Sequence, residues 1–321
     1  MNVVIIVKTN KELSGDAAPI VLMPLIDRPF LQHIIERLVD LGADKITFAI
    51  GPHSEGVKKL FPKGTRWGVK FHYVQATDDR LLYKAAAASL DAKIDSPVLF
   101  GHADRLPGIT SEMISEPLGP GQCRQFTDEA TGEWTAWAQV SPDLLRSVPD
   151  VATEQEIGAL IAEKSVSNYT LKTLDVRSYQ GLLAAQAAGL SGEFPGLIIT
   201  GRTVHPGVRL SRNSNVHPTA VLTGNIFIGE NSRIGADVQL GPNVVIGSDC
   251  VIEAETTVTN SLVLSGTYLG EGLELNNVIA DRGYILSVVH NAAIVVPDTF
   301  IAGSLHTPLF ARILQRTRGR S

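Results

Sequence analysis

His102 and Asp104 lie two residues apart, directly after a short apolar run at 98–100. An imidazole close to a carboxylate can exchange a proton near neutral pH, and both groups are common metal ligands. A histidine at the end of a strand is also often a hydrogen-bonded structural group. The sequence therefore offers two interpretations of this pair, an acid/base or metal site and a structural histidine.

General properties of the chain exclude several classes of site and partner. The two cysteines, Cys123 and Cys250, form neither a CxxC motif nor a Cys/His spacing typical of zinc sites. Acidic residues outnumber basic ones by 33 to 28, whereas DNA and RNA require clustered positive charge. The first residues lack the pattern of a signal peptide, and no apolar run approaches the ~18 residues of a membrane span. We therefore expect a cytoplasmic protein without a nucleic-acid partner.

The elements that must position these residues alternate between short β-branched runs and helical patterns over residues 1–195. Residues 3–7 predict the first strand, and residues 45–50 predict the second. Between them, Pro29 suits the first turn of a helix and Gly42 suits its left-handed C-cap. This alternation predicts an α/β domain with a doubly wound, mostly parallel sheet covered by helices.

A period of six residues replaces this pattern beyond the turn-rich segment 191–196, which we expect to join two domains. Aliphatic residues fall on one register at ten successive positions: Leu210, Val216, Leu222, Ile228, Ile234, Leu240, Ile246, Ile252, Val258 and Leu264. Hexapeptide repeats of this kind form a parallel β-helix with three hexads per turn, so ten hexads predict roughly three coils. After Leu264 the register slips by one residue, to Leu269 and Leu275.

The segment 27–43, the strand at 45–50 and the sequence Gly-Pro-His-Ser-Glu-Gly at 51–56 resemble the nucleotide-sugar pyrophosphorylases, which are sugar-1-phosphate nucleotidyltransferases. Proteins of this family often carry a hexapeptide β-helix behind the catalytic domain. The resemblance implies a Rossmann-like nucleotidyltransferase domain at 1–195 and a left-handed β-helix at 196–303. It also implies a role in nucleotide-sugar or polysaccharide biosynthesis.

The family reaction joins a nucleoside triphosphate to a sugar 1-phosphate and releases pyrophosphate, which requires Mg²⁺ and fixed cations. The resemblance implies a glycine-rich phosphate loop after the first strand, where this chain has Lys8 and Lys11 but no glycine before Gly15. Ile20 stands where the family has a lysine between two prolines. Because an isoleucine cannot hold a phosphate, the expected cradle is incomplete.

The resemblance also implies two metal-binding aspartates. His102 stands in the first position, with Asp104 two residues further on, and the second position falls on Lys172 in one alignment or on Asp175 in another. These departures favour a homologue that binds a sugar phosphate or a nucleoside triphosphate without turnover. An active enzyme remains the alternative, with Lys11, Asp104 and Asp175 as candidate catalytic residues, the two aspartates as metal ligands, and Mg²⁺ as its cofactor.

A third interpretation places acyl transfer on the β-helix, where such enzymes deprotonate the acceptor with a histidine near a coil edge. The candidates are His205, His217 and His290. His217 lies in the sequence Asn-Val-His-Pro-Thr-Ala, which resembles the first hexad of many such solenoids whatever their activity. The solenoid is also the surface through which we expect homo-oligomers to form.

The last segment, residues 304–321, predicts a short basic amphipathic helix. Thr307 suits the N-cap and Pro308 the first turn. The apolar positions Leu309, Phe310, Ile313 and Leu314 lie opposite Arg312 and Arg316. Such a helix either docks on an anionic membrane or a membrane-bound partner, or packs on the chain's own solenoid. In the first case the protein would be held at the inner face of the membrane.

Overall fold

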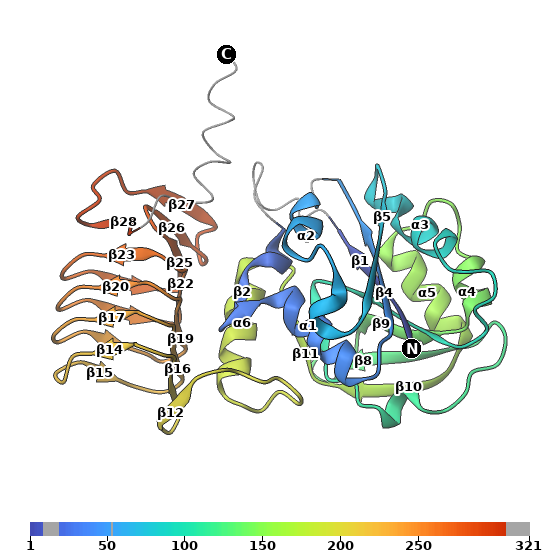
Figure 1. The fold of residues 1–321 in the computed structure, drawn as a ribbon, viewed down its shortest axis with the longest axis horizontal. Helices are drawn as coiled ribbons and strands as arrows, with labels where there is room; N and C mark the ends of the chain where they lie inside the picture. The colour runs from blue at the N-terminus through green and yellow to red at the C-terminus, as the bar shows by residue number, and fades with distance from the viewer. Residues whose placement is uncertain (9–18, 53, 306–321) are drawn as a thin grey trace, which may run out of the picture. The chain divides into compact units, whose positions relative to one another are not determined.

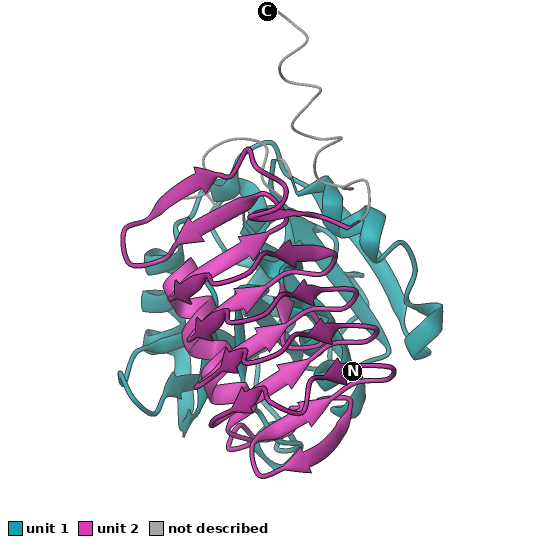
Figure 2. Ribbon diagram, turned by 90° about the vertical axis from the view of Figure 1, so that its left-hand side faces the viewer, with its two compact units in different colours: residues 1–23, 29–177 teal, residues 24–28, 178–321 magenta. Residues whose placement is uncertain are grey.

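The computed structural model describes residues 1–8, 19–52 and 54–305 (Figure 1). Lys11 and residues 306–321 of the predicted C-terminal helix lie outside the described residues. The contacts divide the chain into two compact units (Figure 2). Unit 1 comprises Met1–Met23 and Pro29–Arg177, and unit 2 comprises Pro24–Arg28 and Ser178–Ser321. Each unit has its own cluster of buried apolar side chains.

Unit 1 is built on a seven-stranded sheet with the order β10-β8-β9-β6-β1-β4-β5. Its strands are β1 (Asn2–Val7), β4 (Lys45–Ile50), β5 (Lys70–Gln75), β6 (Val98–His102), β8 (Cys123–Asp128), β9 (Trp134–Val140) and β10 (Ser165–Leu171). Strands β6, β1, β4 and β5 run parallel, and β9 is antiparallel to β6 and β8. The predicted mostly parallel α/β sheet is confirmed.

Unit 1 also contains five α-helices among the described residues, and the first of them lies between the predicted signals. They are α1 (Phe30–Asp40), α2 (Glu55–Leu60), α3 (Leu82–Ala88), α4 (Pro142–Arg146) and α5 (Glu154–Lys164). Gly42, just after α1, has a φ of 85°, which is the left-handed conformation expected of a C-cap glycine. A capping box between Thr153 and Glu156 fixes the start of α5 at Glu154.

A small antiparallel pair connects two distant parts of unit 1. Strand β7 (Arg105–Pro107) follows β6 after a two-residue turn and pairs with β11 (Thr173–Asp175). In this register Arg105 lies opposite Asp175. The pairing therefore holds the end of β11 next to the carboxyl end of the central sheet.

Unit 2 contains a left-handed parallel β-helix whose short strands form three sheets, one on each face. The first face contains β13 (Val208–Leu210), β16 (Ile226–Ile228), β19 (Val244–Ile246), β22 (Leu262–Val263) and β25 (Val278–Asp281). The second contains β14 (Asn215–Val216), β17 (Arg233–Ile234), β20 (Val251–Ile252) and β23 (Thr267–Leu269). The third contains β15 (Val221–Leu222), β18 (Gln239–Leu240), β21 (Thr257–Thr259) and β24 (Glu274–Asn276).

The structure corrects two details of the predicted repeat. Ile246 pairs with Val263, 17 residues further on, whereas the preceding coils repeat at 18 residues. Val263 is therefore the fully buried residue of this rung, and Leu264, which we predicted in that place, is only partly buried. The slip occurs one hexad earlier than expected because the corner before β22 is one residue shorter. The described residues also form four coils, from β13 to β24, rather than roughly three.

Helix α6 (Tyr179–Leu190) belongs to unit 2 together with β2 (Pro24–Leu25). The Gln186 side chain accepts a hydrogen bond from the Ile26 backbone N–H at 2.7 Å and donates one to the Pro24 carbonyl at 2.8 Å. The contacts therefore divide the units at Arg177, ahead of the segment 191–196 in which we expected the junction.

Antiparallel strands close the described end of the solenoid. Strand β26 (Tyr284–Ser287) pairs with β25 and with β27 (Ala292–Val295), and β28 (Ala302–Ser304) pairs with β23. At the other end, β12 (Arg202–His205) is antiparallel to β13. Within the described part of the chain, no helix has both the length and the apolar character needed to cross a membrane.

Candidate functional site

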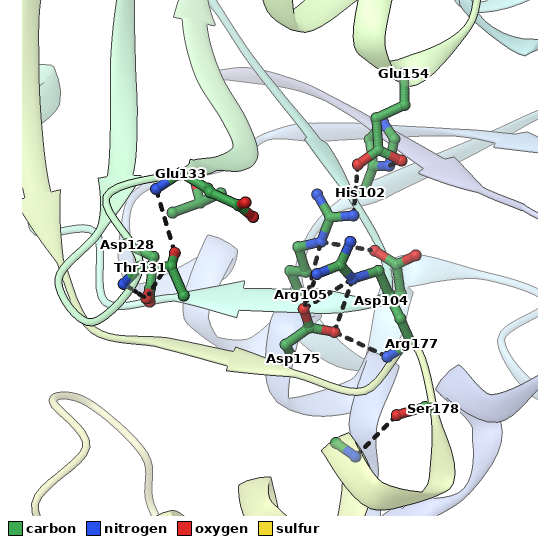
Figure 3. A network of polar contacts seen from close by, with 12 residues as sticks. His102, Asp104, Arg105, Asp128, Thr131, Glu133, Glu154, Asp175, Arg177 and Ser178 are labelled. Carbon is green, nitrogen blue, oxygen red and sulfur yellow. Dashed lines mark hydrogen bonds and ion pairs between the residues drawn. The ribbon is translucent and has the colours of Figure 1, made fainter.

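A cluster of charged side chains gathers at the carboxyl ends of β1 and β6 in unit 1 (Figure 3). We call it the Arg105 cluster, and its members are Lys8, His102, Asp104, Arg105, Glu154, Asp175 and Arg177. In open α/β sheets, ligands bind outside the carboxyl ends of parallel strands. This position makes the cluster the candidate functional site.

Four elements bring these residues together. Ile6 of β1 pairs with His102 of β6, so Lys8, two residues beyond Ile6, lies at the same edge of the sheet. Glu154 is the first residue of α5, and its place follows from the capping box. Residues that are far apart in the sequence thus meet because β1, β6, β11 and α5 all begin or end at this edge.

His102 occupies a closed environment. Its side chain has no exposed surface, and its Nε2 lies 3.1 Å from the Tyr83 hydroxyl. Burial, reinforced by the positive charge of Lys8, lowers the pKa of His102 well below its usual value. The imidazole is therefore neutral near pH 7 and out of reach of a ligand, which favours the structural interpretation of the His102–Asp104 pair.

The turn after β6 is fixed by the indole of Trp137. Its Nε1 donates to the carbonyl oxygens of His102 at 3.1 Å and Arg105 at 2.9 Å. The ring also lies directly on Gly101, where an added Cβ would come within 2.0 Å of the indole. A glycine is needed before His102 because the indole leaves no space for a side chain.

Glu154 is the acceptor that links the cations of the cluster. Its Oε2 accepts from Lys8 Nζ at 2.6 Å, and its Oε1 accepts from Arg105 Nη2. Burial acts to raise the pKa of this carboxyl, but the positive charges of Arg105 and Lys8 and the hydrogen bond from Lys8 outweigh that effect and lower the pKa. Glu154 is therefore ionised at every physiological pH.

Asp104 and Asp175 face the same atom of a buried arginine. Arg105 Nε lies 3.8 Å from Asp104 Oδ1 and 3.9 Å from Asp175 Oδ2. Arg177 Nε donates to Asp175 Oδ2 at 2.8 Å from the other side. Burial raises the pKa of Asp104, and the charge of Arg105 opposes this effect. Three carboxyl groups, those of Asp104, Glu154 and Asp175, thus face the three cations Lys8, Arg105 and Arg177.

These residues do not fit the magnesium site that the family resemblance implies. Mg²⁺ binds oxygen ligands at 2.0–2.1 Å in near-octahedral geometry, whereas a guanidinium lies within 4 Å of both aspartates. The described residues contain no group of three or more His, Cys, Asp or Glu side chains placed to hold a metal ion. The cluster therefore lacks the open carboxylate pair that a Mg²⁺ ion requires.

The other residues singled out in the sequence lie in different surroundings. Ile20 is buried and presents no polar atom of its side chain, and Lys172 is exposed, with its carbonyl accepting from the Gly108 N–H. Of the two alignments, the structure places Asp175 in the cluster and Lys172 outside it. Lys8 is partly exposed, with its Nζ 5.8 Å from the centre of the Tyr83 ring.

The three histidines proposed for acyl transfer are all exposed. His217 Nδ1 lies 2.9 Å from the Thr219 hydroxyl of the same hexad. In the region that the structure describes, none of the three forms an ion pair with a carboxylate that would orient it as a base. The geometry therefore adds nothing to the acyltransferase interpretation.

Three members of the cluster were not predicted from the sequence: Arg105, Glu154 and Arg177. Arg105 and Arg177 lie one and two residues from the candidate aspartates, so proximity was a usable signal. The signal for Glu154 was the Thr-x-x-Glu pattern at 153–156, which marks a helix start and so places a carboxylate at its first position.

Comparison with known proteins supports both halves of the architecture. Residues 222–304 match a family model described as the GMPPB C-terminal domain, which is a left-handed β-helix of sugar nucleotidyltransferases. No curated protein matches the sequence significantly.

Solved structures resemble the chain at low sequence identity. A putative glucose-1-phosphate thymidylyltransferase from Bacillus anthracis, in complex with a sucrose, has a TM-score of 0.50 at 12% identity and covers 63% of this chain and 97% of its own. UDP-glucose pyrophosphorylase from Acinetobacter baumanii has a TM-score of 0.47 at 13% identity and covers 61% of this chain and 95% of its own. HddC from Yersinia pseudotuberculosis has a TM-score of 0.46 at 15% identity and covers 59% of this chain and 99% of its own.

These findings confirm the predicted resemblance at the level of fold. The family model covers most of the solenoid, including its antiparallel end. The thymidylyltransferase shares the fold over nearly its whole length. The chain therefore combines the fold of a sugar-1-phosphate nucleotidyltransferase with a C-terminal left-handed β-helix of the GMPPB type.

Proposed function

We propose that unit 1 binds a sugar phosphate or a nucleotide at the Arg105 cluster and does not transfer the nucleotidyl group. The observation that carries this proposal is the internal charge balance of the cluster. Lys8 and Arg105 are bound to Glu154, and Arg177 is bound to Asp175. A triphosphate would need cations that are free to face it, and each of these three is already paired with a carboxylate.

Ligand binding is supported by the two cations that remain accessible. The side chain of Lys8 is partly exposed and that of Arg177 is about half exposed, both at the carboxyl edge of the sheet. Charge-assisted hydrogen bonds from such groups to a phosphate are among the stronger polar interactions in proteins. A monophosphate carries less charge than a triphosphate and can share these groups without a metal ion.

The test measures binding and turnover separately. Glucose 1-phosphate and several nucleotides are titrated calorimetrically with EDTA present, and pyrophosphate exchange is assayed with Mg²⁺. We expect binding of at least one ligand, no exchange above background, and about tenfold weaker binding by Lys8→Met. Lys84→Met is the control, because Lys84 forms an exposed ion pair with Asp150 away from the cluster.

An active nucleotidyltransferase is the second candidate, favoured by one observation. The β7–β11 pairing brings Asp104 and Asp175 to the same arginine, and two nearby carboxylates are what a magnesium-dependent enzyme of this fold would need. Exchange at ordinary enzyme rates that is lost in Asp104→Asn or Asp175→Asn would establish this candidate and contradict the proposal.

We further propose that unit 2 mediates self-association through the end of its solenoid. All four residues of β27 are exposed, as are the nearby side chains of Val289 and Phe300, the latter at 82%. Contiguous exposed apolar side chains mark interaction surfaces on soluble proteins. Light scattering after gel filtration should show an oligomer that Ile294→Ser and Phe300→Ser weaken, whereas Val151→Ser, an exposed apolar residue of unit 1, should leave it intact.

The basic C-terminal segment is proposed as a contact with anionic membranes at the cytoplasmic face. This proposal rests on its sequence pattern alone. The full chain should sediment with phosphatidylserine-containing vesicles, and a chain without residues 306–321 should not. Co-sedimentation that 0.5 M salt does not reduce would argue against an electrostatic contact.

A further inference from the structure

We propose that the guanidinium of Arg105 takes the place of a divalent cation between Asp104 and Asp175, so that these carboxylates do not bind Mg²⁺ in this protein. The inference goes beyond the proposed function. It concerns the source of positive charge at the two aspartates, and it stands whether or not the cleft binds a sugar phosphate.

Arg105 is held in this position by its surroundings rather than by the two aspartates. Its side chain is only 4% exposed, and its Nη2 is anchored on Glu154. Its backbone is fixed by the β7–β11 pairing and by the Trp137 indole, which donates to the Arg105 carbonyl. The guanidinium is therefore a permanent occupant of the space beside both carboxylates.

Arg105 Nε faces the two aspartates as a positive charge that both share and does not form a hydrogen bond with either of them. Asp104 and Asp175 lie at nearly equal distances from it, 3.8 and 3.9 Å. Within the described residues, neither Arg105 Nε nor Asp104 Oδ1 has a hydrogen-bond partner, although both are buried. A single positive group thus compensates two carboxylates by charge.

Arg177 completes the neutralisation from the solvent side. It binds Asp175 through Nε at 2.8 Å. Together the two guanidinium groups carry the charge of one Mg²⁺ ion: Arg105 lies within 4 Å of both aspartates, and Arg177 binds Asp175. A metal ion would have to displace the guanidinium of a buried arginine from the two aspartates, and breaking up a buried group of paired charges is costly in a protein interior.

The experiment uses Mn²⁺ alone as the probe, followed by electron paramagnetic resonance of the free ion and by calorimetry. Wild-type protein should show no site that depends on the two aspartates. Arg105→Ser should gain one, with an affinity at least about tenfold above any wild-type binding. Arg105→Lys keeps a cation in place and is the matched control, so it should show no gain.

The double variant Arg105→Ser with Asp175→Asn should lose the gained site, which ties the metal to the carboxylate. Arg105→Gln is the second neutral variant and retains more of the side-chain volume, in case the serine disturbs packing. Circular dichroism establishes that each variant is folded. A folded Arg105→Ser and a folded Arg105→Gln that both fail to gain Mn²⁺ would overturn the inference.

If neither neutral variant folds, Mn²⁺ binding to the wild-type protein provides an independent test. Mn²⁺ binding that Asp104→Asn or Asp175→Asn abolishes would show that the aspartates hold a metal despite Arg105, and would overturn the inference. Absence of such binding supports it. The proposed function is judged from ligand titrations in EDTA, so the two proposals fail on different measurements.

Discussion

Glu154 is the residue on which the charge balance of the cluster depends. It accepts hydrogen bonds from both Lys8 and Arg105. Glu154→Gln removes the charge that compensates a buried arginine, and breaking a buried ion pair from one side is strongly destabilising. We expect the free energy of unfolding in urea to fall by about 3 kcal/mol. Glu163→Gln on the same helix, whose partner Lys164 is exposed, should have little effect.

His102 gives the protein a specific sensitivity to mild acid. Its pKa in the folded state is well below the value of 6.5 expected when unfolded. Below pH 6.5 the unfolded chain therefore binds more protons, and stability is lost as the pH falls toward the folded pKa. His102→Gln should reduce the loss of unfolding free energy between pH 7.0 and 5.5 by about 1 kcal/mol.

Chemical denaturation at several pH values between 7.5 and 5.0 measures this effect. The range stays above the lowered pKa of Glu154, so the titration of that carboxyl does not enter. The matched control is His72→Gln, because His72 is exposed on β5. Equal pH slopes for wild type and His102→Gln would contradict a buried neutral imidazole.

The residues of the cluster were only partly predictable from the sequence. Asp104 and Asp175 could be named because the family resemblance implies metal-binding aspartates near these positions. Their partners Arg105 and Glu154 could not be assigned, since the pairing of β7 with β11 and the docking of α5 depend on contacts far apart in the chain. Lys172 and Asp175 are three residues apart, and only the antiparallel register shows which of them faces Arg105.

At the scale of single elements, the turn after β6 depends on a close contact between backbone and ring. Gly101→Ala would place a methyl group about 2 Å from the Trp137 indole, and overpacking of this kind typically costs 1–3 kcal/mol or more. We expect a lower melting temperature and weaker ligand binding, because the same indole fixes the His102 and Arg105 carbonyls. Gly56→Ala, whose nearest contact is a mobile methyl at 3.1 Å, should be mild.

The shortened corner of the β-helix can be tested by a pair of neighbouring substitutions. Val263→Ala removes two methyl groups from a fully buried position and should cost about 2 kcal/mol. Leu264→Ala removes more carbon but from a partly buried position, and should cost less. Thermal unfolding of the two variants compares their loss of stability. A larger loss for Leu264→Ala would mean that the period of six continues without interruption to Leu264.

The elements themselves were largely predictable, for reasons that differ between the two units. The hexad repeat determines the solenoid because each aliphatic residue must stack on the one a coil earlier. The shorter corner before β22 could not be located from the sequence, since Val263 and Leu264 are both aliphatic. Helix α1 was predictable from Pro29 and Gly42 because its caps are local.

For the whole molecule, the sequence predicted the order of the two architectures but not where the compact units divide. Unit 2 begins at Ser178 because α6 packs with β2, a segment from near the N-terminus. Such a contact between distant segments has no local signature in the sequence.

The antiparallel end of the solenoid also determines what kind of assembly can form there. A stack of parallel coils has two unlike ends, so joining copies end to end would produce an open filament. The sheet on the first face instead ends with β26 and β27 running in opposite directions, and β27 is its edge strand. Two such edge strands, one from each copy, can pair about a twofold axis. Each strand then provides hydrogen-bond partners for the other, so assembly stops at a dimer.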